Sequence, residues 1–202
     1  MHAHPCPVVL IGLSGRFRLT LDDHTSFTAH SAVVGAGVRH VFDPQGEQIA
    51  TLYLEPDDTA ARALLPLLMS HRGVLVDVCA PIADRATTAS RLHHVDLDGL
   101  LAHTLPHAPA MDPRVCRVMQ TMRNQAGTQV KRSDAAAWAH LSESRFNHVF
   151  ASHCGVSFRS YRIWCQLRVA MAAMAANVRL TDAAMAGAFA DSAHFSKRFR
   201  EI

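Results

Sequence analysis

The sequence has no run of about 18 consecutive apolar residues, so a membrane-spanning helix is not expected. Its first residues do not form a basic stretch leading into an apolar run, so no secretory signal peptide is expected either. The five cysteines are odd in number and form no CxxC pair, which disfavours a disulfide framework or a zinc knuckle. These absences predict a cytoplasmic protein with no membrane partner.

Positive charge is concentrated in the C-terminal part of the chain. Residues 112–202 contain 13 Lys and Arg against 6 Asp and Glu, whereas residues 1–111 contain 7 against 11. This asymmetry indicates a half that binds a polyanion joined to a half with another task, although a chance surface bias would look the same. Charge alone therefore suggests nucleic acid as a partner without settling it.

The first 55 residues have the pattern of β-structure. Short apolar segments at 8–11, 16–21, 31–34 and 49–54 are separated by turn-forming residues, and strand follows strand about every ten residues. Phe17 lies between two arginines, the alternation of a half-buried strand. The pattern predicts an antiparallel sandwich or small barrel.

Helical signals follow. A helix is expected to open at 57–59 and to end at 71–73, although Pro66 conflicts with a regular helix unless it causes a kink. Further helical pieces are expected over about 84–92 and 96–104. The proline-containing stretch 105–109 is the expected domain boundary, and Pro113 suits the first turn of the next helix.

The C-terminal part contains an internal repeat. Ser133-Asp134-Ala135-Ala136 and Thr181-Asp182-Ala183-Ala184 each predict a hydroxyl cap, an acid in the first turn and then small helix-forming residues. Downstream in each copy come a second cap (Ser142, Asp191) and a phenylalanine pair spaced i, i+4 (Phe146 and Phe150, Phe195 and Phe199), which places both rings on one helix face. A short helix, a tight turn and a second helix held by aromatic residues form a helix-turn-helix unit.

The remaining faces of the two second helices are polar and basic, as a helix that enters a DNA major groove requires. A solvated face of an ordinary helical bundle is the alternative, and it is disfavoured because two such units lie in register in the basic half. The candidate DNA-binding residues are Ser144, Arg145, Asn147, His148, Ser192, His194, Ser196, Lys197 and Arg198. Between the units, apolar residues spaced by three and four predict one long helix from Phe158 to Ala175, which could hold the second helices about one DNA turn apart.

Residues 135–150, 155–158 and 167–170 resemble the first half of an AraC/XylS-type DNA-binding domain, and 190–199 resembles the family signature of its second half. The resemblance implies that Ser144, Asn147 and His148 of the first unit face bases, and Ser192, Ser196 and Lys197 of the second. It also implies a glycine where Ala188 stands, so Ala188 is expected to have a positive φ at a cost of about 1 kcal/mol. The usual Gly-x-x-Pro-x-x-Tyr-Arg segment and final helix are expected to be missing, which would make this a C-terminally truncated domain.

The N-terminal part resembles the cupin-like sensor barrels that precede this domain in many family members, through 2–4, 13–15 and 37–40. The predicted fold is therefore α+β. It comprises a cupin-like antiparallel barrel at 1–55, a helical linker or dimerisation region at 56–110, and an all-α domain at 111–202 with two helix-turn-helix units joined by a long helix.

The protein is predicted to be a transcriptional regulator that binds double-stranded DNA in a sequence-specific manner. A small-molecule effector and a second copy of the chain, in a homodimer, are further expected partners. No enzymatic activity and no cofactor are expected. Two alternatives stay open. One is a truncated regulator that dimerises without binding DNA. The other is a cupin metalloprotein that uses His2, His4 and His40, three imidazoles that could line a barrel mouth, although the glutamate usual in metal cupins is absent. A catalytic Cys154–His153 pair is disfavoured because adjacent helical residues point to different sides.

Overall fold

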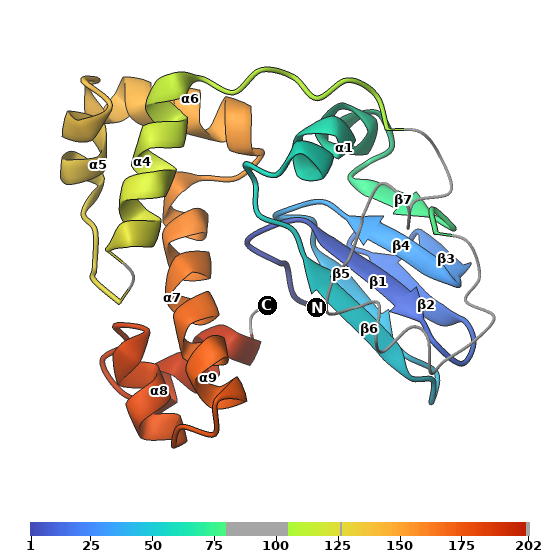
Figure 1. Cartoon of the computed structure of the whole chain (residues 1–202). Helices are drawn as coiled ribbons and strands as arrows, with labels where there is room; N and C mark the ends of the chain where they lie inside the picture. The colour runs from blue at the N-terminus through green and yellow to red at the C-terminus, as the bar shows by residue number, and fades with distance from the viewer. Residues whose placement is uncertain (80–104, 126, 201–202) are drawn as a thin grey trace. The chain divides into compact units, whose positions relative to one another are not determined.

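The computed structural model describes residues 1–79, 105–125 and 127–200, which belong to two compact units, Met1–Pro109 and Ala110–Ile202 (Figure 1). The α+β fold predicted from the sequence is confirmed: the first unit carries antiparallel sheets and the second is helical. The helical pieces expected over 84–92 and 96–104 lie outside the described residues. No helix of the described ranges is both long and apolar enough to cross a membrane.

Two antiparallel sheets form the N-terminal unit. A four-stranded sheet has the order β6-β1-β4-β7, and a three-stranded sheet has the order β3-β2-β5. The strands are β1 Val8–Gly12, β2 Phe17–Leu21, β3 Ser26–Ala29, β4 Ser31–Val34, β5 His40–Asp43, β6 Ile49–Tyr53 and β7 Val74–Val76. β3, β5 and β7 are additional to the four strands that the sequence pattern predicts.

The side-chain pattern of β1 explains how the layers pack. Val8 and Leu10 point into a core shared with Phe17 and Leu19 of the second sheet, whereas Val9 and Ile11 point to the opposite face, toward a helix. Because both faces of β1 are buried, its sequence is an unbroken apolar run rather than an alternation. The four-stranded sheet is thus the middle layer of the unit.

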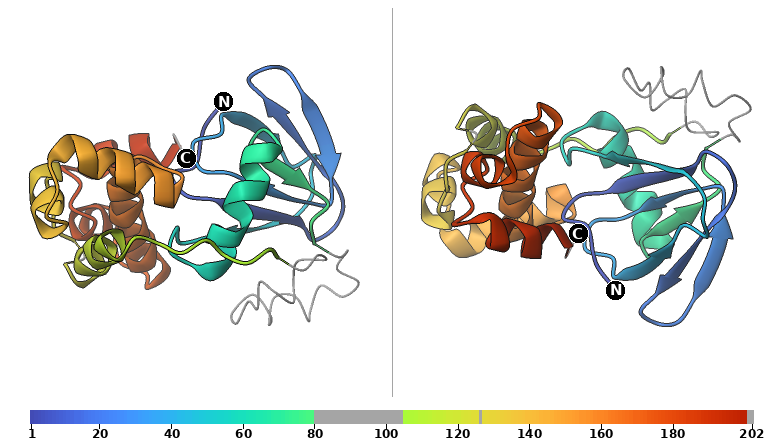
Figure 2. Two further views of the ribbon diagram at one scale, coloured as in Figure 1. Left: turned by 90° about the horizontal axis from the view of Figure 1, so that it is seen from above. Right: turned by 90° about the horizontal axis from the view of Figure 1, so that it is seen from below.

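Helix α1 (Thr59–Ser70) covers the outer face of that middle sheet (Figure 2). Ala61, Leu64 and Leu68 of α1 are buried against Val33 and its neighbours. The kink or break anticipated at Pro66 does not end the helix, which continues to Ser70 with Pro66 on its exposed side. The proline lacks an amide hydrogen, but the packing of the apolar face on the sheet holds the helix together.

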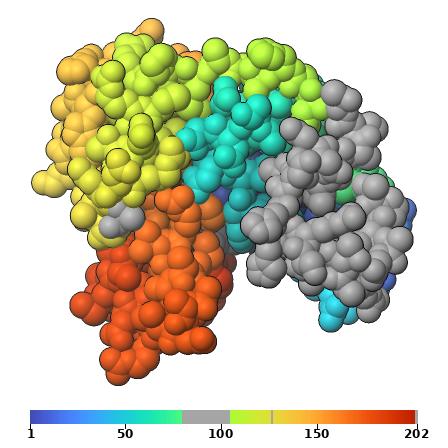
Figure 3. All heavy atoms as spheres, in the orientation of Figure 1, coloured from blue at the N-terminus to red at the C-terminus, as the bar shows by residue number. Residues whose placement is uncertain are grey.

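The C-terminal unit contains α4 (Pro113–Asn124), α5 (Arg132–Trp138), α6 (Glu143–Cys154), α7 (Phe158–Ala175), α8 (Leu180–Ala186) and α9 (Ser192–Arg200). Asp112 caps α4: its side chain accepts a hydrogen bond from the Arg114 amide at 2.8 Å, and Pro113 occupies the first turn as expected. In a space-filling view, the segment between α4 and α5 lies against α7 (Figure 3). Arg162 of α7 donates to the carbonyl of Val130 in this segment at 3.2 Å.

Candidate nucleic-acid interface

Two helix-turn-helix units lie at the two ends of α7. The first consists of α5 and α6, and the second of α8 and α9 (Figure 1). In both, the second helix begins at the predicted cap: Ser142 accepts from the Arg145 amide at 3.3 Å, and Asp191 accepts from the His194 amide at 2.6 Å. The second cap of each copy is therefore confirmed.

The turns of the two units have the same backbone design. His140 and Ala188 both adopt a left-handed conformation, with φ of 53° and 56°. The next residue in each case, Leu141 or Phe189, donates its amide back to the preceding helix at 3.0 Å. The positive φ expected at Ala188 is confirmed, and Gln166 of α7 donates to the Ala188 carbonyl at 3.0 Å, which fastens this turn to the long helix.

The first caps are not those expected. The sequence suggested Ser133 and Thr181, but α5 begins at Arg132 and α8 at Leu180, so both hydroxyl residues lie inside the first turn. In the first unit Asp134 takes the capping role, accepting from the Lys131 amide at 3.3 Å. In the second unit no side chain caps α8, and Asp182 accepts from the Arg179 guanidinium at 3.0 Å instead. An acid at the third helical position can satisfy the free N-terminal groups without a hydroxyl cap.

Each unit has its own core. In the first, Phe146 and Phe150 are fully buried, with ring centroids 5.6 Å apart, and both rings contact Phe158. Ala135 and Ala136 are also buried, so α5 can approach closely. This matches the prediction from the phenylalanine pair.

The second core is smaller than predicted. Phe195 is buried with Leu167, Ala184 and Phe189, but Phe199 remains 42% exposed. The ring of Phe199 lies 5.6 Å from that of Phe195, so both rings share one helix face as the spacing predicts, although the buried cluster includes only Phe195. One aromatic side chain, rather than two, holds α9 in the core.

The predicted DNA-binding side chains lie on the outer faces of α6 and α9. Exposed positions are Ser144, Arg145, His148, His194 and Lys197, and half-buried positions are Asn147, Ser192, Ser196 and Arg198. None of the nine is in the buried core of the unit. Both faces can therefore be reached by a large ligand.

Basic side chains of the helix-turn-helix units are available to bind a polyanion. Arg132 pairs with Glu143, and Arg179 pairs with Asp182 at 3.0 Å. Such exposed pairs contribute at most about 1 kcal/mol, so a phosphate can replace the carboxylate. In the described part of the chain, no carboxylate lies within salt-bridge distance of Arg145 or Lys197.

Helix α7 sets the separation of the two units. It runs from Phe158 to Ala175, as the sequence predicted, and its 18 residues correspond to about 27 Å at 1.5 Å per residue. Tyr161, Trp164 and Leu167 bury its inner face. Successive major grooves on one face of a duplex are about 34 Å apart, a distance of the same order.

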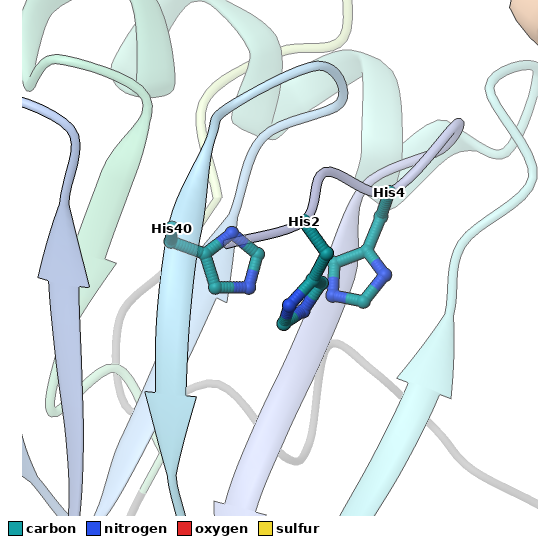
Figure 4. A group of neighbouring side chains, drawn as sticks. All are labelled: His2, His4 and His40. Carbon is teal, nitrogen blue, oxygen red and sulfur yellow. The ribbon is translucent and has the colours of Figure 1, made fainter. Parts of the chain in front are cut away.

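The structure also places the histidine cluster and Cys154, two other candidate sites suggested by the sequence. His2, His4 and His40 lie together in the N-terminal unit, with ring centroids between 4.3 and 5.1 Å apart (Figure 4). Cys154 is buried, with its sulfur 3.8 Å from that of Met119, so it packs as a core residue.

Sequence reasoning missed a groove in the N-terminal unit. Its volume is about 940 Å³, and it lies beside α1, β3 and β7. The lining is mostly apolar and includes Phe27, Leu67, Leu75 and Val78, with Arg72 among its polar residues. No sequence signal marks it, because the lining residues come from separate segments that only the fold brings together.

Comparisons with known proteins agree with this geometry. Residues 135–202 match a family described as helix-turn-helix domain. No curated protein sequence matches the chain. Apo ToxT from Vibrio cholerae strain SCE256 has a TM-score of 0.63 at 11% identity, with 98% of this chain and 86% of ToxT covered. ToxT from strain O395, bound to a methylnaphthalenyl butenoic acid, has a TM-score of 0.63 at 10% identity, with 99% and 87% covered.

A third structure, wild-type ToxT with a bound unsaturated fatty acid, has a TM-score of 0.57 at 11% identity, with 98% of this chain and 84% of ToxT covered. At these identities the similarity establishes a shared fold. The family match concerns residues 135–202 alone, as an AraC-type helix-turn-helix domain.

Proposed function

We propose that the protein is a transcriptional regulator that reads DNA sequence through α6 and α9 together. The observation that carries the proposal is the duplicated unit: two capped helices with solvent-facing polar and basic side chains, held at the two ends of α7. A helix presented in this way fits a major groove, where its side chains can bond to base edges.

The exposed residues divide into two roles. Ser144, Asn147 and His148 of α6 carry donors and acceptors suited to base edges, as do Ser192 and Ser196 of α9, and Lys197 can donate to guanine. Arg145, His194 and Arg198 would contact phosphates and fix the register of the protein on the duplex. Arg132 and Lys131, beside the start of α5, would add to this non-specific attraction.

The proposal is tested by selecting binding sites from a library of random duplexes about 30 base pairs long. The account expects enriched sites with two conserved elements about one helical turn apart, and affinity that falls steeply as salt is raised. Arg117→Ala is the control and should select the same sites as the wild type. It removes an exposed arginine of the C-terminal unit that lies outside both helix-turn-helix units. Equal enrichment of all sequences would oppose sequence-specific recognition, whereas no binding at all would favour the regulator that dimerises without DNA.

The groove of the N-terminal unit supports a small apolar acid as effector. Its lining would bury a hydrocarbon chain, and the Arg72 guanidinium could pair with a carboxylate after leaving Asp23, with which it forms an exposed ion pair at 2.9 Å. ToxT, which shares the fold, has been solved with carboxylic acids bound. The predicted homodimer stays a prediction.

Oleic acid is a suitable probe for this groove. We expect saturable binding to the wild-type chain and at least a tenfold loss in Leu67→Glu, because the carboxylate introduced into the groove would be desolvated and would repel the ligand. Met69→Glu is the matched control, since Met69 lies on the same helix, is 79% exposed and does not line the groove. The same loss in both variants would contradict binding in the groove.

A further inference from the structure

Backbone hydrogen bonds hold the three histidines of the N-terminal unit together. His2 and His40 exchange two backbone hydrogen bonds, each 2.9 Å long, and Gly37 donates to the carbonyl of His4 at 2.9 Å. The N-terminal segment therefore runs along the start of β5. Figure 4 shows the rings of His2 and His4 turned toward that of His40.

The ring nitrogens are prepared to accept a ligand. Nδ1 of His40 lies 2.9 Å from the Val38 carbonyl oxygen, which can only accept, so the proton is on Nδ1 and the lone pair is on Nε2. That Nε2 is buried without a hydrogen-bond partner in the described part of the chain, and so is Nδ1 of His4. Buried polar atoms without a protein partner are costly, and in native proteins an ordered water or an ion commonly satisfies them.

The three imidazoles lie mostly away from solvent. His4 and His40 are buried, and His2 is half-buried.

We propose that His2, His4 and His40 form a three-imidazole binding site for a late first-row divalent metal ion such as Zn²⁺. One nitrogen from each ring lies within 4.8 Å of the others, somewhat wider than the spacing of about 3.3 Å that tetrahedral Zn–N bonds of about 2.0–2.1 Å require. Rotation of the imidazole side chains would close this difference. A water molecule or an effector group would complete the coordination.

The donor set defines the class of metal. Imidazole suits zinc, copper, iron and nickel, whereas magnesium and calcium prefer oxygen ligands, and the group contains no carboxylate. A bound ion would fasten the N-terminal segment to β5, so metal binding is expected to stabilise this unit. The inference is independent of DNA binding by the other unit.

The test is a calorimetric titration of metal-free, untagged protein with Zn²⁺. We expect one equivalent to bind per chain, Mg²⁺ not to bind, and His2→Ala to weaken Zn²⁺ binding at least tenfold. His107→Ala, which removes an exposed histidine of the same unit, is the matched control and should bind like the wild type. Titration with Co²⁺ adds a spectroscopic check, since visible d–d bands would appear in the control and be lost or shifted in His2→Ala.

Thermal unfolding with and without Zn²⁺ keeps the test valid if the variant is less stable. The shift in midpoint caused by the metal should be present in the wild type and the control and absent in His2→Ala. The proposal is overturned if the wild type binds Zn²⁺ no more tightly than His2→Ala, or if His107→Ala loses binding to the same degree.

Discussion

The left-handed backbone of Ala188 permits a quantitative test of how the second helix-turn-helix is built. An L-residue with a Cβ atom at this φ of 56° is strained by about 1–2 kcal/mol, and glycine is not. Glycine also increases the entropy of the unfolded chain, which opposes the gain by about 0.5–1 kcal/mol. Ala188→Gly is therefore expected to stabilise the unit by about 0.5–1 kcal/mol.

Ala186→Gly is the matched control, because Ala186 is exposed and is the last residue of α8. Both variants exchange alanine for glycine, so the effect on the unfolded chain is the same and cancels in the comparison. Ala186→Gly should lose about 0.5–1 kcal/mol. The two variants should therefore differ by about 1–2 kcal/mol, which is the strain itself.

Urea unfolding followed by tryptophan fluorescence measures this difference. Both tryptophans, Trp138 and Trp164, lie in the C-terminal unit, so the signal reports on that unit alone. The dependence of the unfolding free energy on urea should be the same in the variants, with only the midpoints displaced. If both variants were destabilised equally, Ala188 would not be strained and the proposed likeness of the two turns would fail.

Three further outcomes follow from the structure. Phe195→Ala should destabilise the C-terminal unit by about 3–5 kcal/mol in the same urea assay, because Phe195 is buried, whereas the exposed Phe199→Ala should cost less than about 1 kcal/mol; similar losses would contradict the assignment of the small core. Asp112→Ala should cost about 0.5–2 kcal/mol through the lost cap of α4. Hydrogen bonds from Arg114 lower the pKa of Asp112 from 3.8 to about 2. The stabilisation by the Asp112 carboxylate is therefore complete above pH 3.8 and is lost as the pH falls toward 2. The unfolding free energies of the wild type and Asp112→Ala should converge only in that pH range. Arg145→Ala should weaken binding to every duplex alike and flatten the salt dependence, whereas His148→Ala should change the preferred base; equal losses across a panel of operator variants would refute this division.

The parts of the fold that depend on local periodicity could be predicted from the sequence. The 18 residues of α7 follow a sustained spacing of apolar residues, and the caps Ser142 and Asp191 precede clear helices. β3 and β5 are short segments with exposed residues that gain stability by pairing with β2, so their own sequences carry little signal. Ser133 shows a different limit, since either Ser133 or Asp134 can cap a helix and only the three-dimensional structure selects Asp134. The sequence around Thr181 likewise suggests a cap, but no side chain caps α8.

The candidate sites also differ in how far the sequence could predict them. The polar faces of α6 and α9 could be predicted, because a helix of known phase fixes which residues point away from its phenylalanines. The grouping of His2 with His40 is expected only through the resemblance to cupin barrels, because it depends on the N-terminal segment lying beside β5, which sequence spacing does not encode. Phe199 has the same spacing from Phe195 as Phe150 from Phe146, yet only the fold shows that its ring lies outside the core.

A base-interference footprint on a selected site measures whether α6 and α9 read neighbouring segments of one duplex. We expect two interfering major-groove segments about one turn apart, with Asn147→Ala abolishing contacts in one and Lys197→Ala in the other. A single segment, or the same change from both substitutions, would contradict this expectation.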